Sequence, residues 1–435
     1  VRPDDLAILV YTSGTTGKPK GAMHSHEGLV FTVRGYNTLI SRDESDECMC
    51  FLPLCHIAER LGGEYFSLYT GSKLNFVENP ETVPENVREI SPTVFTAVPR
   101  VWEKFYSAVM IGLKEATPLQ RAVYGWGIGL GERIATDVMA ERPVGGGTRL
   151  QYRIARWLAL DNVRKMIGIH RCRFLITGAA PISPDLVRWY MALGIDLLEA
   201  FGMTETSGTV TAMPRDAIRI GFAGRAAPGV EVKRATDGEL LVRGPNVFAG
   251  YWQQPELTGQ AIDTEGWLHT GDVAEIDASG YVGIRDRIKD IIITSGGKNI
   301  TPTTIESLVK FSPYISDAVV IGEARRYVTC LVMLDQENIV QFAQTRQVPF
   351  TDYASLTRTD AVIALVRAEI EAVIAELARV EQIKDFRIID VLLTAEDEEL
   401  TPTMKLKRRV IHQKYAALID SMYHQETADG GRKTA

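Results

Sequence analysis

A run of glycine, hydroxyl and lysine residues near the start of the chain has the composition of a loop that binds polyphosphate. The run reads Tyr11-Thr12-Ser13-Gly14-Thr15-Thr16-Gly17-Lys18-Pro19-Lys20-Gly21. Glycine lets backbone amides approach an anion closely, and hydroxyl and ammonium groups add donors and positive charge. These residue types predict that the loop holds nucleotide phosphates, most simply those of ATP. The residues that would contact the phosphates are Thr12, Ser13, Gly14, Thr15, Thr16, Gly17, Lys18 and Lys20.

The loop differs from a Walker A loop in two respects. Only two residues separate Gly14 from Gly17, and Pro19 stands where a serine or threonine would bind magnesium. A kinase or GTPase function is therefore excluded. Taken alone, such a run is also compatible with a simple flexible turn. An apolar stretch at residues 6–10 and a helix expected from about Glu27 flank it, and this strand-loop-helix setting suits a phosphate site.

The whole chain has an ordinary globular composition. Its 435 residues are 45% hydrophobic and 24% charged, which leaves room for two or three domains. The net charge of -7 argues against a nucleic-acid partner. Five cysteines, an odd number, favour a reducing, cytoplasmic location. No apolar stretch is long enough to span a membrane, so we expect a soluble or peripheral protein. The start without methionine, close to a strand and the loop, suggests a fragment.

Apolar strands alternate with helical stretches from the start of the chain to about residue 285. This pattern predicts a large α/β domain with a largely parallel sheet, whose binding groups lie on loops beyond the carboxyl ends of the strands. Shorter antiparallel β-structure is expected after residue 221. Strands are expected at residues 73–77, 94–98, 173–177 and 195–200.

Residues from about 102 to 171 form a different, mostly helical insertion in this domain. Its second half is rich in arginine and lysine around Trp157, so it could contact a membrane surface or an acidic partner, or simply form a solvated helix face. The basic residues are Arg149, Arg153, Arg156, Arg164, Lys165, Arg171 and Arg173.

A smaller α+β unit is expected beyond Lys289. Strands are predicted at residues 319–321 and 328–334, and an amphipathic helix is predicted over residues 361–383. The polar residues 424–435 are expected to form a disordered tail. The sequence therefore predicts domains at 1–288 and 289–423.

Further segments resemble the motifs of the adenylate-forming, AMP-binding superfamily, in that family's order and over nearly the whole chain. The resemblance is strongest to long-chain fatty-acid–CoA ligases with part of the N-terminal domain missing. The motifs are Gly178-Ala179-Ala180-Pro181, Phe201-Gly202-Met203-Thr204-Glu205-Thr206, Trp267-Leu268-His269-Thr270-Gly271-Asp272, Asp286-Arg287-Ile288-Lys289-Asp290 and Thr401-Pro402-Thr403-Met404-Lys405-Leu406-Lys407.

The resemblance implies a role for each motif. Gly178, Ala179, Ala180, Phe201, Gly202 and Met203 would surround the adenine. Residue chemistry agrees with the remaining roles: Thr204 can donate to an α-phosphate, Glu205 can hold Mg²⁺, and Asp272 can accept hydrogen bonds from ribose hydroxyls. Arg287 is a second donor to ribose or phosphate.

The resemblance implies a reaction in two halves. A carboxylate attacks the α-phosphorus of MgATP to give an acyl-adenylate and pyrophosphate, and the thiol of CoA then displaces AMP. Lys405 would be the catalytic cation, with Lys407 as the alternative. The small domain would be mobile about a hinge at Lys289. His56 matches a position that lines the carboxylate site, although a core histidine is also possible.

The substrate is expected to be a fatty acid, because Trp102 lies where long-chain relatives gate an acyl tunnel. Core packing of Trp102 is the alternative. The expected partners are fatty acid, ATP and CoA, and peripheral contact with a membrane stays open. Other functions stay open: a fatty-acyl-AMP ligase that passes the acyl group to a carrier protein, a non-catalytic nucleotide-binding or acyl-adenylate-binding fragment, and a luciferase-type oxygenase.

Overall fold

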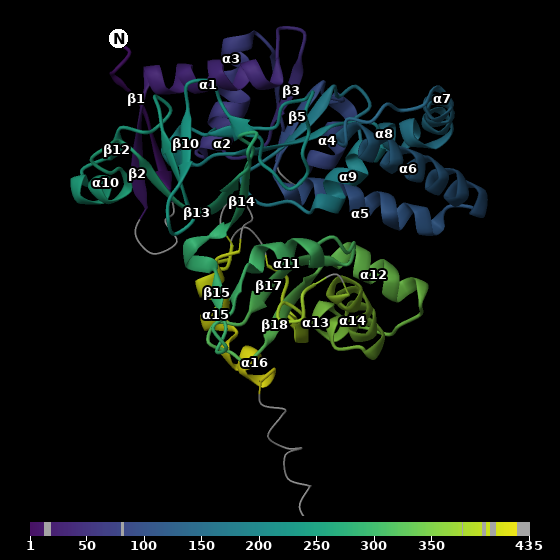
Figure 1. The fold of residues 1–435 in the computed structure, drawn as a ribbon. Coiled ribbons are helices and arrows are strands. Elements are labelled where there is room, and N and C mark those ends of the chain that lie inside the picture. Colours follow the sequence, from purple (N-terminus) through teal and green to yellow (C-terminus); the bar gives the residue numbers. More distant parts are fainter. Residues whose placement is uncertain (13–18, 80–81, 376, 394–396, 401–405, 424–435) are drawn as a thin grey trace, which may run out of the picture. The chain divides into compact units, whose positions relative to one another are not determined.

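The computed structural model describes residues 1–12, 19–79, 82–375, 377–393, 397–400 and 406–423. The chain divides into two compact units, Val1–Ile288 and Lys289–Ala435. Both combine helices with β-sheets (Figure 1). The predicted α/β class, with a large first unit and a smaller α+β second unit, is confirmed.

A five-stranded sheet in the order β5-β6-β7-β8-β9 lies at the centre of the first unit. Its first three strands are parallel and the last two are antiparallel, and β3 and β4 form a separate parallel pair. The strands predicted from the sequence in this region are confirmed within one or two residues. The strands are β3 (Glu47–Cys50), β4 (Lys73–Phe76), β5 (Val94–Ala97), β6 (Phe174–Thr177), β7 (Leu197–Phe201), β8 (Thr211–Ala212) and β9 (Arg225–Ala226).

Two further sheets of the first unit are antiparallel, in the orders β1-β2-β12 and β10-β11-β13-β14. The antiparallel β-structure predicted after residue 221 is therefore confirmed by the sheet β10-β11-β13-β14, whereas the expectation of a largely parallel sheet was wrong for β1-β2-β12. The pairs β1-β2, β10-β11 and β13-β14 are consecutive strands with no helix between them in the described ranges, and parallel pairing would need such a crossover. The strands are β1 (Leu6–Thr12), β2 (Lys20–Ser25), β10 (Glu231–Arg234), β11 (Glu239–Arg243), β12 (Gly250–Tyr251), β13 (Leu268–Ile276) and β14 (Val282–Arg287).

A strand, not a helix, follows the glycine-rich loop, which corrects the expected strand-loop-helix order. Strand β2 pairs with β1, with Thr12 opposite Lys20, and it buries alternate side chains at Ala22 and His24. The helix predicted from about Glu27 is confirmed as α1 (His26–Ile40), which begins after β2, where the Ser25 hydroxyl accepts a 3.1 Å hydrogen bond from the Gly28 amide. The glycine-rich run thus connects two strands of a hairpin.

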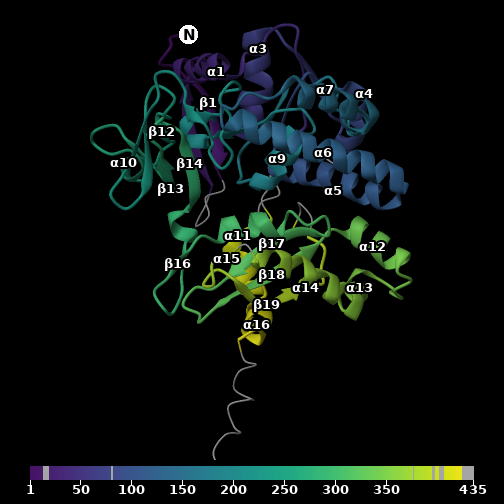
Figure 2. The ribbon, with the colours of Figure 1, turned by 45° about the vertical axis from the view of Figure 1, so that its right-hand side comes forward.

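The helices of the first unit include a group that covers residues 99–166. Helix α6 of this group packs on α9, a later helix of the chain. The contact is so tight that a Cβ at Gly131 on α6 would overlap the Ala192 backbone on α9. Figure 2 shows α5, α6 and α9 together on one side of the unit. The helices are α2 (Ile57–Glu59), π-helical η1 (Arg60–Tyr65), α3 (Phe66–Thr70), α4 (Val83–Ile90), α5 (Pro99–Glu115), α6 (Pro118–Met139), α7 (Gly146–Ala155), π-helical η3 (Arg156–Leu160), α8 (Asp161–Met166), α9 (Pro184–Ala192), 3₁₀-helical η4 (Thr204–Thr206) and α10 (Pro255–Ala261).

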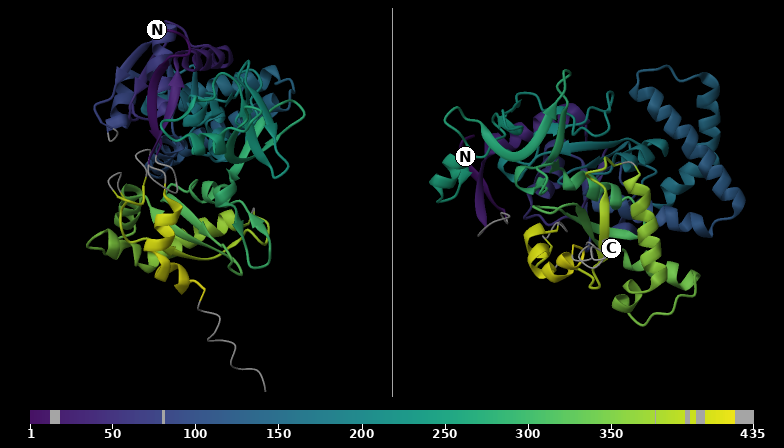
Figure 3. Two further views of the ribbon diagram at one scale, coloured as in Figure 1. Left: turned by 90° about the vertical axis from the view of Figure 1, so that its left-hand side faces the viewer. Right: turned by 60° about the horizontal axis from the view of Figure 1, so that its bottom comes forward.

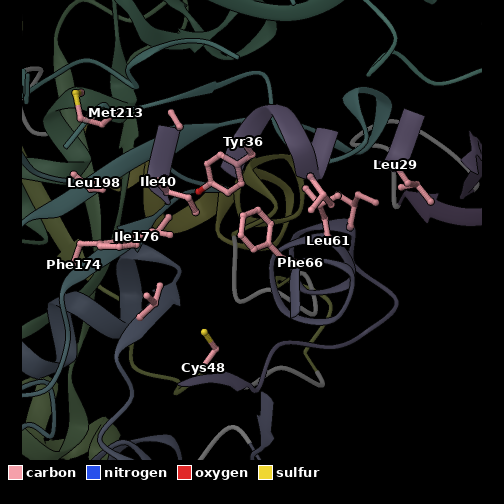
Figure 4. Packing of buried hydrophobic residues seen from close by; sticks show 14 of the residues in the cluster. Leu29, Tyr36, Ile40, Cys48, Leu61, Phe66, Phe174, Ile176, Leu198 and Met213 are labelled. Carbon is pink, nitrogen blue, oxygen red and sulfur yellow. The ribbon is translucent and has the colours of Figure 1, made fainter. Parts of the chain in front are cut away.

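One apolar core joins α1 to strands β6 and β7. Figure 4 shows the rings of Tyr36 and Phe66 close together in this core, which also contains Ile176 and Leu198, and the two rings meet edge to face with centroids 5.5 Å apart. Such aromatic pairs add stability beyond the area they bury. This core fixes the two parallel strands whose carboxyl ends carry the first motif loops.

The second unit contains a three-stranded sheet in the order β17-β18-β19 and the pair β15-β16. The strands predicted at 319–321 and 328–334 are confirmed. The elements are β15 (Ile292–Ile293), β16 (Asn299–Ile300), α11 (Pro302–Val309), β17 (Ile315–Ile321), β18 (Val328–Leu334), α12 (Gln336–Thr345), α13 (Tyr353–Thr357), α14 (Asp360–Ile374), β19 (Ile383–Ile388), α15 (Arg408–Lys414) and α16 (Ala416–Ser421).

The helix predicted over residues 361–383 is too long. Helix α14 ends at Ile374, and Ile383 begins β19, which pairs parallel with β18 and buries Ile383 and Phe386. Ile383, the last residue of the predicted helix, belongs to a strand instead, because a short apolar run is compatible with either a helix or a strand. In the described ranges, none of the helices is both long and apolar enough to cross a membrane.

Candidate active site

Two motif loops begin where the neighbouring parallel strands β6 and β7 end. Gly178 directly follows β6, and a Cβ there would lie 3.0 Å from the Ala200 carbonyl oxygen on β7. Ala179 adopts a left-handed conformation with φ of 65°. The Thr177 hydroxyl is buried and has no hydrogen-bond partner in the described part of the chain. The Gly178-Ala179-Ala180 motif thus lies against the strand that leads to Phe201.

The loop after Phe201 is folded tightly upon itself. Gly202 has no room for a Cβ, because such an atom would overlap the Gly208 carbonyl oxygen. The Thr206 hydroxyl accepts from the Met203 amide at 3.0 Å, and the Gly208 amide donates to the Met203 carbonyl at 3.1 Å. These bonds fix the short helix η4, on which Thr204 and Glu205 remain partly exposed. Both predicted side chains are therefore held by a rigid loop.

Glu205 is held by hydrogen bonds to both its side chain and its backbone. Its Oε1 accepts a 2.7 Å hydrogen bond from the Tyr251 hydroxyl, and its carbonyl accepts from the Phe248 amide at 2.9 Å. The Lys20 ammonium lies 5.0 Å from the centroid of the Tyr251 ring. Tyr251 thus joins Glu205 to Lys20, the second lysine of the glycine-rich run.

The environment of Glu205 fits a magnesium ion that takes most of its ligands from phosphate and water. Mg²⁺ is commonly held by one or two carboxylates together with substrate phosphates. Within the described ranges, no group of three or more histidine, cysteine, aspartate and glutamate residues is arranged to hold a metal. A cation at Glu205 would therefore need the nucleotide to complete its coordination.

His24 belongs to this region and was missed by the motif comparison. Its ring is fully buried, its Nδ1 lies 3.1 Å from the Ser207 hydroxyl, and its Nε2 has no partner among the described residues. Burial lowers the pKa of His24 to about 4, so the imidazole is neutral at neutral pH. Only the alternation of buried residues along β2 could have indicated this inward histidine.

Glu199 is a second titratable group that the motifs did not indicate. It lies on β7 before Phe201 and accepts a hydrogen bond from the Gly221 amide. Burial raises the pKa of Glu199 to about 8. A carboxyl group that is largely protonated at neutral pH therefore lies in the strand that leads to the adenine motif.

Asp272 and Arg287 face each other across β13 and β14. The Arg287 Nε lies 2.7 Å from Asp272 Oδ1, and Asp272 is buried while Arg287 is exposed. Strand β13 packs on the same apolar cluster as Phe201 and Met203. The structure thus brings the two predicted ribose-binding residues together, on a strand that shares its core with the adenine motif.

His56 precedes α2, close to the loop that carries Glu205. A Cβ at Gly208 would contact Ile57 and Leu61, so α2 and η1 pack directly against that loop. His56 itself is partly exposed.

Trp102 is fully buried in an aromatic cluster. Its Nε1 donates to the Ala97 carbonyl at 3.2 Å, and its ring lies 5.2 Å from that of Phe95 and 5.6 Å from that of Tyr190. In this conformation the side chain is part of the core.

The remaining predicted residues belong to the glycine-rich run and to the second unit. Ser13, Gly14, Thr15, Thr16, Gly17, Lys18 and Lys405 lie outside the described residues. Lys289 is the first residue of the second unit and lies in the 3₁₀ turn η5 (Ile288–Asp290). Lys407, the alternative cation, donates its backbone amide to the Glu399 carbonyl at 2.7 Å.

Comparison with known families gives two matches that together cover most of the chain. The AMP-binding enzyme family matches residues 1–252, and the AMP-binding enzyme C-terminal domain matches residues 289–427.

Several named relatives are similar to this protein over nearly the whole chain. The fadD11 protein of Mycobacterium tuberculosis, named provisionally as a fatty-acid–CoA ligase, is 37% identical over 98% of this chain and 75% of its own. The long-chain-fatty-acid–CoA ligase FadD15 of Mycobacterium bovis is 32% identical over 98% and 70%. The long-chain-fatty-acid–CoA ligase ACSBG2 of Gallus gallus is 33% identical over 97% and 59%.

Solved structures share the fold. The adenylation domain of a carboxylate reductase from Mycobacterium chelonae superposes with a TM-score of 0.74 at 23% identity, over 97% of this chain and 60% of that chain. ATP-bound MatB from Rhodopseudomonas palustris superposes with a TM-score of 0.65 at 25% identity, over 96% and 70%. The chain therefore spans about 60 to 70% of these structures.

Proposed function

Because the chain belongs to the AMP-binding family of adenylate-forming enzymes, we propose that it activates a long-chain fatty acid with ATP and transfers the acyl group to CoA. Relatives that bear the name fatty-acid–CoA ligase and are 32 to 37% identical to the chain support this choice of substrate. The reaction first forms a fatty acyl-adenylate and pyrophosphate. The thiol of CoA then attacks the acyl carbon, and AMP leaves.

The arrangement of Glu205, Tyr251 and Lys20 carries this proposal. A carboxylate held at 2.7 Å by a phenol, with a lysine ammonium over the same ring, combines a magnesium ligand with a cation for phosphate. Mg²⁺ bound by Glu205 would neutralise phosphate charge. The enzyme itself has mainly to align two anions that repel each other.

The other residues of the first unit are assigned by their chemistry. Thr204 donates to the α-phosphate. The Asp272 carboxylate accepts from the ribose hydroxyls, and Arg287, 2.7 Å away, orients it. Gly178, Ala179, Ala180, Phe201, Gly202 and Met203 enclose the adenine, and residues 12–18 with Lys20 contact the phosphates. His56 lies beside the carboxylate of the fatty acid.

Trp102 is assigned to the entrance of the acyl site. Its burial means that gating would require the ring to leave an aromatic cluster. Removing a tryptophan from such a core typically costs about 3–5 kcal/mol. We therefore expect gating to involve a rearrangement of α5 as a whole and not of the ring alone.

The second unit supplies the catalytic cation and the movement between half-reactions. Lys405 bridges the attacking carboxylate and the α-phosphate. Residues 289–423 form a mobile domain that turns about Lys289, and residues 1–288 form the nucleotide-binding domain. All five cysteines are free, as expected for an enzyme of the cytoplasm. We expect this enzyme to bind peripherally to a membrane and to take up its fatty acid there.

Isotope exchange between ATP and pyrophosphate tests the proposal. Exchange should depend on a long-chain fatty acid when acids of increasing chain length, an amino acid and an aromatic acid are compared. Adding CoA should then yield the thioester and AMP. Exchange without thioester formation would favour a ligase that serves a carrier protein, and no exchange with any acid would contradict an adenylating activity.

A further inference from the structure

The continuous helical segment α7–η3–α8 carries an apolar face that no part of the described chain covers. Leu150, Ile154, Trp157 and Leu158 recur at the spacing of one helical face, and their residues are 59%, 44%, 76% and 45% exposed. Single exposed apolar residues are ordinary, but four on three successive turns form a contiguous patch. We call these four residues the α7 face.

The opposite side of the same segment is packed against the protein. The Tyr152 hydroxyl donates to the Ala192 carbonyl at 2.8 Å, and Ala155 and Leu160 are fully buried. A Cβ at Gly127 on α6 would lie 3.2 Å from Leu160. The segment is therefore held by its inner side, and the α7 face cannot turn inward without breaking these contacts.

The charges around the α7 face are strongly positive. Residues 146–166 contain five basic residues and one acidic residue, whereas the whole chain has a net charge of -7. The acidic residue, Asp161, is already paired with Arg156 at 2.9 Å and lies 3.6 Å from Arg164. The exposed cations that remain are Arg149, Arg153 and Lys165, and none of them has an ion-pair partner in the described ranges.

The position of the segment suits contact with a large flat partner. Helices α6 and α7 lie at the outer edge of the first unit in Figure 1, and the blue helices of residues 99–155 stand at the edge of that unit in the right-hand view of Figure 3. Trp157, the most exposed of the four residues, has the amphipathic side chain that favours a membrane interface.

We propose that the α7 face docks the protein on the surface of an anionic phospholipid bilayer. Leu150, Ile154, Trp157 and Leu158 enter the boundary between headgroups and acyl chains, and Arg149, Arg153 and Lys165 contact lipid phosphates. Unpaired cations beside an apolar helical face match an anionic bilayer, which offers both apolar depth and negative charge. This surface deepens the proposed function, because long-chain fatty acids partition into membranes.

Co-sedimentation of the full chain with lipid vesicles tests the docking surface. Vesicles of equal parts phosphatidylcholine and phosphatidylglycerol should bind the protein, and vesicles of phosphatidylcholine alone should bind it much more weakly. Trp157→Ser should weaken binding about tenfold or more at every salt concentration, because it removes apolar burial. Arg153→Glu should weaken it about fivefold for each unit of charge changed, and this effect should fade in high salt.

Matched variants separate docking from folding and from catalysis. Leu68→Ser replaces an equally exposed residue, at 76%, on α3, and Arg34→Glu reverses an exposed charge on α1; both should bind vesicles like the wild type. Arg153→Lys should retain binding. The assay contains no ATP, CoA or fatty acid, so its outcome is independent of whether the proposed activity is correct.

Three results would overturn the proposal. One is a wild-type chain that does not prefer anionic vesicles. Another is Trp157→Ser and Arg153→Glu variants that bind as the wild type does. The third is a concentration-dependent dimer that Trp157→Ser dissociates without any vesicle binding, which would make the face a contact between two copies of the chain.

Discussion

The Tyr251 hydroxyl donates a 2.7 Å hydrogen bond to Glu205 Oε1, although the two residues are far apart in the sequence. The bond joins strand β12 to the loop after β7. It orients the carboxylate that is proposed to hold magnesium, and a hydrogen bond to a charged group is stronger than one between neutral groups.

Tyr251→Phe should weaken the dependence of adenylation on magnesium. Losing a hydrogen bond to a charged group costs about 1.5–3 kcal/mol, so we expect the magnesium concentration needed for half-maximal ATP–pyrophosphate exchange to rise about 10- to 150-fold. Tyr124→Phe is the control, because it removes a 2.7 Å bond with the Trp189 indole away from the motif loops. An equal effect of both variants would exclude a specific role for Tyr251.

Arg287→Lys should raise the KM for ATP about tenfold and change kcat much less. Lysine keeps the charge but loses the planar guanidinium that places Nε 2.7 Å from Asp272. Arg243→Lys is the matched control, since it alters the 2.7 Å ion pair with Glu231 on β10. Steady-state kinetics with ATP as the varied substrate provides the measurement. A fall in kcat with an unchanged KM would argue against a role of Arg287 in binding the nucleotide.

Glu199→Gln should flatten the pH dependence of stability on the alkaline side. The pKa of about 8 in the folded protein exceeds the value of about 4.3 for an unfolded glutamate, so the folded state binds more protons between these values. The free energy of unfolding should therefore fall as pH rises through this window, by at most about 1.4 kcal/mol per pH unit.

Thermal melts of the wild type and Glu199→Gln at pH 6 and pH 8.5 check this sign. The wild type should lose more stability than the variant at the higher pH. Glu256→Gln, at an exposed position on α10, should behave like the wild type. A variant that is less stable than the wild type at both pH values by the same amount would contradict the raised pKa.

Much of the fold could be predicted, because helical and strand periodicities reflect burial directly. The strands β4 to β7 and β18 follow apolar runs with clear boundaries. The hairpin β1–β2 was missed because the sequence Lys20–Ser25 alternates around small residues, and the end of α14 was missed because Ile383 fits a helix and a strand equally. Pairing with a partner strand, which no local pattern encodes, decided both.

The motifs gave the positions of Glu205, Asp272 and Arg287 but not the residues that hold the Glu205 loop. Tyr251 and His24 contact that loop from distant strands, and neither lies in a motif with chemical meaning of its own. The unusual pKa values of His24 and Glu199 arise from burial, which a sequence does not state.

Lys405→Ala should reduce adenylation about 10²–10³-fold, the usual cost of losing a preorganised electrostatic group. Thioester formation from supplied acyl-adenylate and CoA should be largely retained, because that step has no attack on phosphorus. Lys407→Ala is the control and should affect neither half-reaction strongly. If Lys407→Ala, and not Lys405→Ala, blocked exchange, the catalytic cation would be Lys407.

Lys289→Pro should impair thioester formation more than adenylation. Proline fixes φ at about -65°, so it restricts the rotation that a hinge needs between half-reactions. Lys289→Ala retains the backbone freedom and should leave both steps nearly unchanged. Single-turnover measurements of each half-reaction make the comparison, and equal losses in both would argue against a hinge at this residue.

The contact between Gly131 and Ala192 has a mechanical consequence for the helical segment of residues 99–166. Helix α9 is the crossover between β6 and β7, so α6 is attached to the same crossover that sets the ends of both strands. Helix α7 is also bonded to the end of α9, because the Tyr152 hydroxyl donates to the Ala192 carbonyl, so a force applied at α7 would reach the crossover through packed contacts. A bilayer that holds this edge would then restrict small displacements of the nucleotide loops as well as the location of the enzyme.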